Sequence, residues 1–280
     1  MIDELMTKLP IAIILPHASL EIPPELTDRI ALTEEQIFNE ADAYTDLIYD
    51  FRDRVVQWHR FPYARSIIDV NRASQTIQQM PIPIGDGIVK RVTSYGTDVY
   101  IADKEPDVEL EQFLITKYWQ PWHDQLATIA TDPSIKLVLD CHSMASKAPS
   151  HYSRANDVRP RISVSNLGDE EGNPLLQGIN STAPADLTRL VAQKFGKALA
   201  GLNDLVPTSR DYAVNQPFVG GADLLMHGGR AQPWLMIELS RATYIGEQTG
   251  DSFISLPKQA RIELIREKLW KVIVDIVEDL

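Results

Sequence analysis

The sequence predicts a three-layer α/β fold, in which helices cover both faces of a single β-sheet. Short apolar runs alternate along the chain with longer segments that have helical periodicity, and this alternation is typical of α/β proteins. Most of the short runs are apolar throughout, without alternating polar residues. Such runs indicate strands whose two faces are both buried, so helices must pack on each side of the sheet.

Five short segments have the composition of buried strands, because they are rich in β-branched and other apolar residues. The first of them ends at Pro16, and proline is rare inside central strands. The expected strands are residues 11–15, 66–70, 136–139, 161–165 and 234–239.

Four longer segments are expected to be helical, since their apolar residues recur at helical spacing. Thr33 and Gln36 form a capping-box pattern at the start of the first segment. Pro121 should kink or divide the second, because proline removes one helical hydrogen bond. The expected helices are residues 33–57, 106–129, 185–202 and 256–280.

Composition narrows the class of protein further. The net charge of −12 argues against a nucleic-acid-binding surface. The single cysteine, Cys141, excludes an internal disulfide and fits a reducing compartment. The chain has no signal-peptide pattern and no apolar run of the roughly 18 residues that span a membrane. We therefore expect one cytoplasmic domain over residues 1–280 that acts on a small molecule.

Two long polar or Pro/Gly-rich segments, residues 80–88 and 145–160, are expected to be loops over an active site. A third irregular segment, residues 215–229, contains Gly220 and Gly221. Glycine permits a positive φ or close approach to a ligand.

Two histidines lie at strand ends, where ligands bind in open α/β sheets. His17 follows the first expected strand and His142 follows the third. Imidazole is a common zinc ligand, and a catalytic zinc takes three protein ligands and a water. A carboxylate from Asp42, Glu40 or Glu21 would complete the set. The alternative is that each histidine is a hydrogen-bonded loop residue.

Arg65, Asn71 and Arg72 cluster around the second expected strand. A guanidinium binds a carboxylate in a bidentate manner, and an adjacent amide adds a donor. This cluster therefore suits the carboxylate of a substrate. A surface ion pair with Asp69 is an equally good interpretation.

Glu238 is flanked by apolar residues in the last expected strand. A buried carboxylate is costly unless it is paired, close to a metal or shifted in pKa. A general base that activates water beside a metal occupies such a position. The alternative is a structural salt bridge with Arg241.

Seven segments, which occur in order along nearly the whole chain, resemble the N-formylglutamate amidohydrolase family. They are LPHASLEIPPEL (15–26), EADAYTDLIYDF (40–51), ARSIIDVNRA (64–73), VLDCHSM (138–144), ISVSNLGDEEGN (162–173), NQPFVGGADLLMHGG (215–229) and LMIELSRATYI (235–245).

The resemblance implies an αβα sandwich with a mixed, mostly parallel sheet, of the phosphorylase/hydrolase-like type and related to zinc carboxypeptidases. It also implies one zinc ion per chain. The implied reaction is the hydrolysis of N-formyl-L-glutamate, a small acidic N-acyl amino acid, to formate and L-glutamate in histidine degradation.

Carried over by position, the resemblance implies zinc ligands, substrate-binding residues and a general base. The ligands would be His17, Asp42 and His142. The substrate carboxylates would be held by Arg65, Asn71 and Arg72. The base would be Glu238, which would later protonate the leaving amine.

The chain departs from the family in two places. His17 is followed by Ala-Ser where the family often has Ser-Gly, and Tyr44 stands where it often has a histidine. A zinc deacylase for another N-acyl amino acid, or a binding protein without catalysis, therefore remains as an alternative function.

Overall fold

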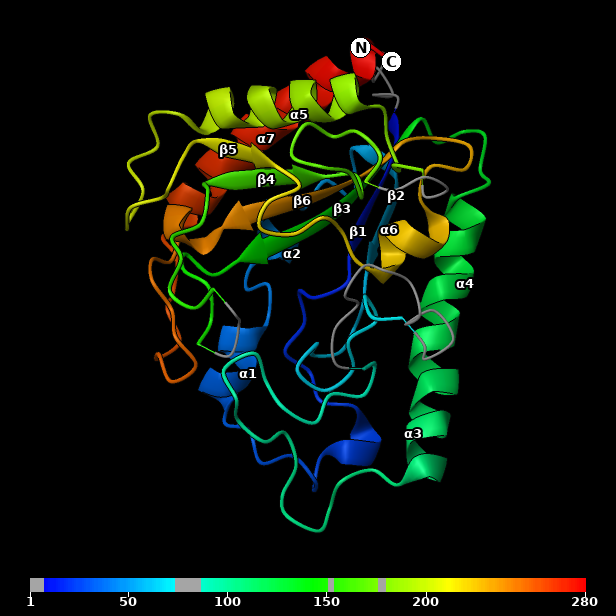
Figure 1. Cartoon of the computed structure of the whole chain (residues 1–280), viewed down its shortest axis with the longest axis vertical. Coiled ribbons are helices and arrows are strands. Elements are labelled where there is room, and N and C mark those ends of the chain that lie inside the picture. Colours follow the sequence, from blue (N-terminus) through cyan, green and yellow to red (C-terminus); the bar gives the residue numbers. More distant parts are fainter. Residues whose placement is uncertain (1–7, 74–86, 151–153, 176–179) are drawn as a thin grey trace, which may run out of the picture.

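The computed structural model describes residues 8–73, 87–150, 154–175 and 180–280. These residues contain a six-stranded sheet with the order β2-β1-β3-β6-β4-β5 (Figure 1). Neighbouring strands are parallel except β4 and β6, which are antiparallel, so the sheet is mixed and mostly parallel as expected. The strands are β1 (Leu9–Leu15), β2 (Val55–Arg60), β3 (Leu137–Met144), β4 (Ile162–Ser165), β5 (Tyr212–Val214) and β6 (Trp234–Ser240).

Helices cover both faces of this sheet, which confirms the three-layer fold. Figure 1 shows α5 and α7 together along one face and α4 along the other. The helices are α1 (Glu34–Glu40), α2 (Thr45–Ile48), α3 (Val108–Leu114), α4 (Gln120–Ile129), α5 (Ala185–Leu199), α6 (Ala222–His227) and α7 (Gln259–Glu278). In the described part of the chain, no helix has both the length and the apolar character that crossing a membrane requires.

Two hydrophobic cores lie on opposite faces of the sheet. Ile13 belongs to the core that includes α5 and α7, whereas Ile14 belongs to the core that includes α4. Adjacent residues divide in this way because successive side chains of a strand point to opposite faces. Cys141 and His142 divide likewise: Cys141 lies in the first core, so it points away from the face that His142 occupies.

The helix expected over residues 33–57 is wrong beyond its first part. Thr33 caps α1 with the predicted capping box, but α1 ends at Glu40. The chain is extended at Ala41 and has a positive φ of 65° at Tyr44 before α2 begins. This interruption of the helix places Asp42 next to His17, because the N–H of Asp42 donates a hydrogen bond to the carbonyl of His17 (3.0 Å). The last residues of the expected helix, 55–57, belong instead to strand β2.

The strand expected over residues 66–70 is also wrong. These residues form turns, and Ile68 makes an isolated bridge with Val89. Ile67, Ile68 and Val70 are apolar because they are buried in the core beside α4. The apolar run in this segment therefore indicates that the residues are buried, but it does not indicate that they form a strand of the sheet.

The other expected elements are close to the observed ones. Pro121 interrupts the long second helix as predicted: the π-helical segment Ile115–Trp119 separates α3 from α4, because a proline ring disturbs the preceding turn. The short β5 and α6 were not predicted. The loop expected over residues 80–88 lies outside the described residues up to residue 86.

Strands β3 and β6 bring two of the expected site residues together. Their parallel pairing places His142 in register with Glu238. Both side chains therefore project from the same face at the carboxyl edge of the sheet.

Candidate active site

Three of the expected residues meet in a cluster that could hold a metal ion. His17 lies just after β1, Asp42 lies between α1 and α2, and His142 lies in β3. One ligand atom from each residue can be chosen so that all lie within 4.8 Å of one another. All three side chains are buried. The carboxyl ends of β1 and β3, together with the break in the helical segment, thus build a single site.

The geometry of this cluster fits a metal. Nδ1 of His142 and Nδ1 of His17 lie 2.8 Å and 3.5 Å from Oδ2 of Asp42. Ligand atoms around a tetrahedral zinc are about 3.3 Å apart, since each bond measures roughly 2.0–2.2 Å. Nδ1 of His17 is buried and has no hydrogen-bond partner among the described residues. A metal ion would satisfy this nitrogen.

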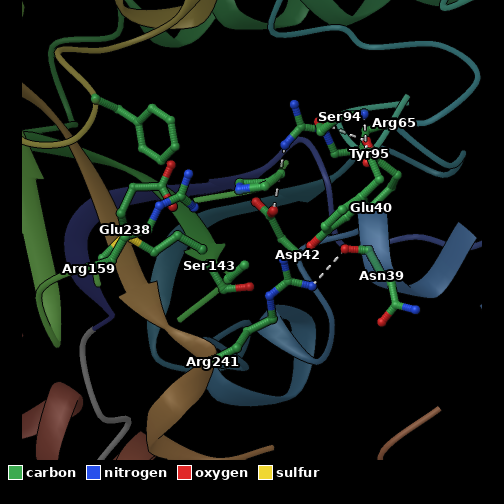
Figure 2. A pocket seen from close by; sticks show the side chains of 14 residues that line it. Asn39, Glu40, Asp42, Arg65, Ser94, Tyr95, Ser143, Arg159, Glu238 and Arg241 are labelled. Atoms are coloured by element: carbon green, nitrogen blue, oxygen red, sulfur yellow. Dashed lines mark hydrogen bonds and ion pairs between the residues drawn. The ribbon is translucent and has the colours of Figure 1, made fainter. Parts of the chain in front are cut away.

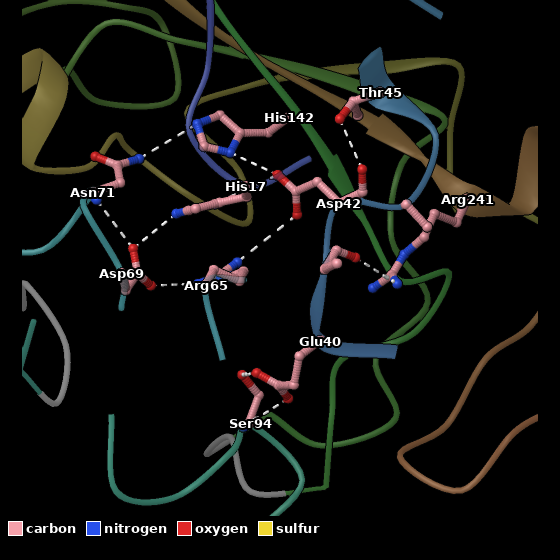
Figure 3. A network of polar contacts seen from close by, with 12 residues as sticks. His17, Glu40, Asp42, Thr45, Arg65, Asp69, Asn71, Ser94, His142 and Arg241 are labelled. Atoms are coloured by element: carbon pink, nitrogen blue, oxygen red, sulfur yellow. Dashed lines mark hydrogen bonds and ion pairs between the residues drawn. The ribbon is translucent and has the colours of Figure 1, made fainter. Parts of the chain in front are cut away.

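The outer nitrogens of both rings lie against carboxylates. Nε2 of His17 lies 2.8 Å from Oδ1 of Asp69 (Figure 3), and Nε2 of His142 lies 2.9 Å from Oδ1 of Asp140. Such contacts fix the ring orientation of metal-binding histidines and make them stronger ligands. Burial lowers the pKa of His142, but Asp140 and Asp42 outweigh it and raise that pKa well above its usual range. The cluster therefore attracts a cation.

Asp69 also pairs with the two arginines of the candidate substrate-binding cluster. Its Oδ2 lies 2.9 Å from Nη2 of Arg65 and 3.5 Å from Nη2 of Arg72. Burial favours the neutral form of Asp69, but Arg72, His17 and Arg65 outweigh it and hold the pKa of Asp69 well below its usual range. The ion pair with Asp69 does form, and its carboxylate is fully buried.

Asn71 lies between the metal cluster and α6. Its side-chain nitrogen is 3.3 Å from Nε2 of His142, and its Oδ1 accepts a hydrogen bond from the N–H of Asp223 (2.9 Å). A Cβ atom on Gly221 would lie only 2.2 Å from that oxygen. The lack of a side chain at Gly221 therefore makes room for Asn71, whereas the sequence suggested the close approach of a ligand.

Asp42 is the carboxylate that reaches the two histidines, whereas Glu40 and Glu21 are placed elsewhere. Glu40 accepts hydrogen bonds from the backbone N–H (2.8 Å) and the hydroxyl (3.1 Å) of Ser94. Glu21 is exposed. Burial favours the neutral form of Asp42, but the hydrogen bond from His142 and the nearby ring of His17 outweigh it and keep the pKa of Asp42 well below its usual range.

Arg241 holds the segment that carries Asp42. Its Nη1 donates to the carbonyls of Asn39 and Ala41, both at 3.0 Å, and to Oε1 of Gln248 at 3.1 Å. Arg241 follows β6, so these bonds join the end of that strand to the residues that precede Asp42. The salt bridge that the sequence suggested between Glu238 and Arg241 is not among the contacts of the described residues.

A cavity of about 50 Å³ opens beside Asp42 (Figure 2). Three arginines, two of which the sequence did not single out for binding, line it together with the expected base Glu238. The lining residues are Asn39, Glu40, Asp42, Arg65, Ser94, Tyr95, Ser143, Met144, Ala145, Pro149, Arg159, Phe218, Glu238 and Arg241. Arg65 is thus at the cavity wall, whereas Asn71 and Arg72 lie behind it around Asp69.

Glu238 has the electrostatic character of a general base. Burial raises its pKa to about 7; the charge of Asp42 adds to this rise, and His142, Arg159 and Arg65 oppose it. Its Oε2 has no hydrogen-bond partner within the described ranges. A carboxyl with a pKa near neutrality can both accept and return a proton.

Four residues of the site received no functional role from the sequence: Asp69, Asp140, Arg159 and Arg241. Asp140 carried a usable signal, because it precedes His142 by two residues on a strand and must share its face. Asp69 and Arg241 entered the sequence analysis only as ion-pair partners, and Arg159 carried no signal, since its position depends on how the connection between β3 and β4 folds.

Comparisons with known proteins identify the family and support the fold. The model of the N-formylglutamate amidohydrolase family matches residues 9–245. The fold is similar to that of N-formylglutamate amidohydrolase from Ralstonia eutropha JMP134, with a TM-score of 0.70 and 20% identity over 97% of this chain and 93% of that chain. No curated protein gives a significant match.

A weaker similarity links the chain to carboxypeptidase A from Helicoverpa armigera, with a TM-score of 0.40 and 14% identity over 98% of this chain and 62% of that chain. This likeness is too slight to support an argument. The family match covers most of the sequence and includes every residue of the metal cluster as well as Glu238. The chain therefore belongs to the N-formylglutamate amidohydrolase family and is a hydrolase of amide bonds.

Proposed function

We propose that the protein is a zinc-dependent deformylase that converts N-formyl-L-glutamate and water to formate and L-glutamate. The observation that carries this proposal is Glu238, a buried carboxyl with a pKa raised to about 7, in the same cavity as Asp42. Family membership supports the type of bond that is cleaved. We place the reaction in the cytoplasm, late in histidine degradation.

His17, Asp42 and His142 would hold one zinc ion per chain, since two imidazoles and a carboxylate are a common donor set for catalytic zinc. Zinc, when bound, acts as a Lewis acid and lowers the pKa of a coordinated water. Asp69 and Asp140 keep the two imidazole rings in the orientation that the site requires.

Glu238 is the proposed proton carrier. It takes a proton from the attacking water as the new C–O bond forms at the formyl carbon. It then gives that proton to the amide nitrogen as the C–N bond breaks, and this transfer releases the amine of glutamate. Its buried setting supports this double role, because neither its charged nor its neutral form strongly dominates near pH 7.

Arginines supply positive charge for the anionic groups of the substrate. Nη1 of Arg65 lies 3.8 Å from Oδ1 of Asp42, so its guanidinium can stabilise the negative charge that develops on the formyl oxygen or bind a substrate carboxylate. We assign one substrate carboxylate to Asn71 and Arg72, which lie two and three residues after Asp69. Binding this carboxylate would hold the amide bond beside Glu238.

The test combines elemental analysis of the purified protein with a formate-release assay, with and without a chelator. About one zinc per chain and chelator-sensitive formate release from N-formyl-L-glutamate would support the proposal. Zinc without formate release would redirect the search to N-acetyl and N-succinyl amino acids. No metal after reconstitution with zinc would contradict the ligand set and favour a binding protein.

A further inference from the structure

Residues 69–72 form a turn, the site turn, that carries two side chains in contact with the proposed metal ligands. Asp69 lies 2.8 Å from the ring of His17, and Asn71 lies 3.3 Å from the ring of His142. The site turn is not a strand, so no ladder of sheet hydrogen bonds fixes its position. Other contacts must hold it against the metal cluster.

Donors from α4 and from the helical turn before it bind two carbonyls of the site turn. The carbonyl of Val70 lies 2.9 Å from Nε2 of His123 in α4. The indole nitrogen of Trp119 donates to the carbonyl of Arg72 (2.8 Å). Residues four apart on a helix share a face, and the rings of Trp119 and His123 are in contact, with centroids 4.0 Å apart. One face of the helix thus grips the site turn at both ends.

The tautomer of His123 follows from its two partners. A carbonyl oxygen can only accept a hydrogen bond, so Nε2, which faces Val70, must carry the proton. Nδ1 is then an acceptor, and Nε2 of His227 lies 2.9 Å from it. His227 therefore donates this bond and keeps the ring of His123 in the tautomer that binds the turn. Both rings are neutral, because burial lowers the pKa of His123 to about 4 and that of His227 to about 3.

A second metal site is the competing interpretation of this buried pair of histidines. Nε2 of His123 lies 3.9 Å from Oδ1 of Asp223, but that nitrogen is already bound to a carbonyl. In the part of the chain that the structure describes, only His17, Asp42 and His142 bring three possible ligand atoms together. The pair is therefore better explained by its hydrogen bonds.

We propose that His123, kept in one tautomer by His227, is a positioning residue that holds the site turn against the two histidines of the metal cluster. Its effect reaches the metal through Asp69, which fixes the orientation of the ring of His17. The inference rests on the proposed function for the identity of the metal. It gives a role to two buried side chains that the proposed reaction does not use.

The first experiment uses two amides to separate the two nitrogens of His123. The amide of glutamine reaches about as far as Nε2 and can still donate to the carbonyl of Val70, whereas the amide of asparagine ends near Nδ1 and cannot. Zinc affinity is measured by competition with a chelator of known affinity. His123→Asn should bind zinc about 10-fold more weakly, as when an outer contact of a metal site is lost. His123→Gln should restore most of the affinity.

His59 offers a matched pair of controls. It also contacts α4, through the side chain of Gln125 (2.9 Å), and its other ring nitrogen lies 2.9 Å from the side chain of Gln57. His59→Asn and His59→Gln therefore change a histidine beside the same helix whose two ring nitrogens are both engaged away from the site turn. Both variants should bind zinc as the wild type does.

The second experiment follows the site turn itself in the metal-free protein. The N–H groups of Asp69 and Arg72 donate to backbone carbonyls (2.8 and 3.2 Å), so a looser turn exposes them to exchange with solvent. Hydrogen exchange in a peptide that covers residues 67–73 should be about 2–10-fold faster in His123→Asn than in the wild type, the effect of losing one hydrogen bond. Exchange in α7 is the internal reference, since a general loss of stability would speed exchange there as well.

The outcomes separate this inference from the proposed function. Wild-type zinc affinity in His123→Asn would overturn the inference. Equal weakening in His123→Asn and His123→Gln would overturn it too, because the ring would then serve only to fill the core. If the wild type binds no zinc, the proposed ligand set fails, and the exchange experiment alone decides whether His123 holds the turn. Exchange in residues 67–73 that is the same in the wild type and His123→Asn would then overturn the inference.

Discussion

Nε2 of His17 lies 2.8 Å from Oδ1 of Asp69, and both side chains are buried. The other nitrogen of the same ring faces Asp42. His17 is thus held between two carboxylates, Asp69 on one side of the ring and Asp42, its partner in the proposed metal site, on the other. Asp69 does not line the cavity. We therefore expect it to influence the proposed reaction through its contacts with His17, Arg65 and Arg72.

Replacing Asp69 with asparagine should weaken zinc binding by about 10–100-fold, which is typical of the loss of a carboxylate behind a metal-binding histidine. Asparagine has the same shape as aspartate but lacks the negative charge that makes His17 a stronger metal ligand. Competition with a chelator of known affinity measures the change. Asp46→Asn, which removes a carboxylate that pairs with Arg60 away from the cavity, should bind zinc as the wild type does. Unaltered affinity in Asp69→Asn would show that the contact is not needed for metal binding.

Replacing Glu238 with glutamine should leave zinc bound and reduce kcat by about 10²–10⁴-fold, because the proton carrier is lost while the ligands remain. The measurement is formate release together with zinc content. Glu247→Gln is a suitable control, since Glu247 pairs with Lys147 outside the catalytic cavity. Turnover close to that of the wild type in Glu238→Gln would remove Glu238 from the base role.

The pKa of Glu238 predicts how stability depends on pH in the metal-free protein. Burial raises this pKa from its ordinary value of 4.5 to about 7, so the folded state retains a proton that the unfolded state has lost between these values. The free energy of unfolding of the wild type, relative to Glu238→Gln, should therefore fall as pH rises from 4.5 to about 7 and then level off. Urea unfolding of both proteins across this range measures the difference. A constant difference would mean that Glu238 titrates as it does in the unfolded chain.

Replacing Gly221 with alanine should disturb the site through Asn71. The added Cβ would lie 2.2 Å from Oδ1 of Asn71, so either Asn71 or the start of α6 must move, at a cost of about 1–3 kcal/mol. We expect lower stability in thermal unfolding and reduced turnover. Gly201→Ala is the control, because Gly201 has a φ of +82° but no atom within 4 Å of an added Cβ. That variant should lose stability and keep its turnover, and equal effects on both would exclude a specific role for Asn71.

The sequence predicted the central strands well, because β1, β3 and β6 are buried on both faces and therefore apolar throughout. The sequence did not reveal β2, because β2 is an edge strand with mostly half-buried residues. It also suggested a strand at Ile67 and Ile68, which are buried but do not join the sheet. The helical pattern around Asp42 failed for another reason. The backbone is extended at Ala41 and has a positive φ at Tyr44, and periodicity of apolar residues cannot reveal such a local break.

Within the site, the strand pattern alone indicated the residues at strand ends, whereas the choice of Asp42, which lies between two helices, depended on the resemblance to a family. His17 and His142 meet because parallel strands end at one edge, and Glu238 joins them through its register with His142. Arg159 and Arg241 reach the cavity through loop and backbone contacts that no spacing in the sequence records.

The antiparallel direction of β4 has a consequence for how such enzymes diversify. Because β4 runs against β6, the connection from β3 to β4 both leaves and re-enters the sheet at the catalytic edge, and it brings Arg159 there. None of the three proposed metal ligands lies on this connection. A change in its length or composition can therefore alter the wall of the cavity, to which Arg159 belongs, without replacing His17, Asp42 or His142. Exchange of this one segment between relatives is thus a natural route to new substrates.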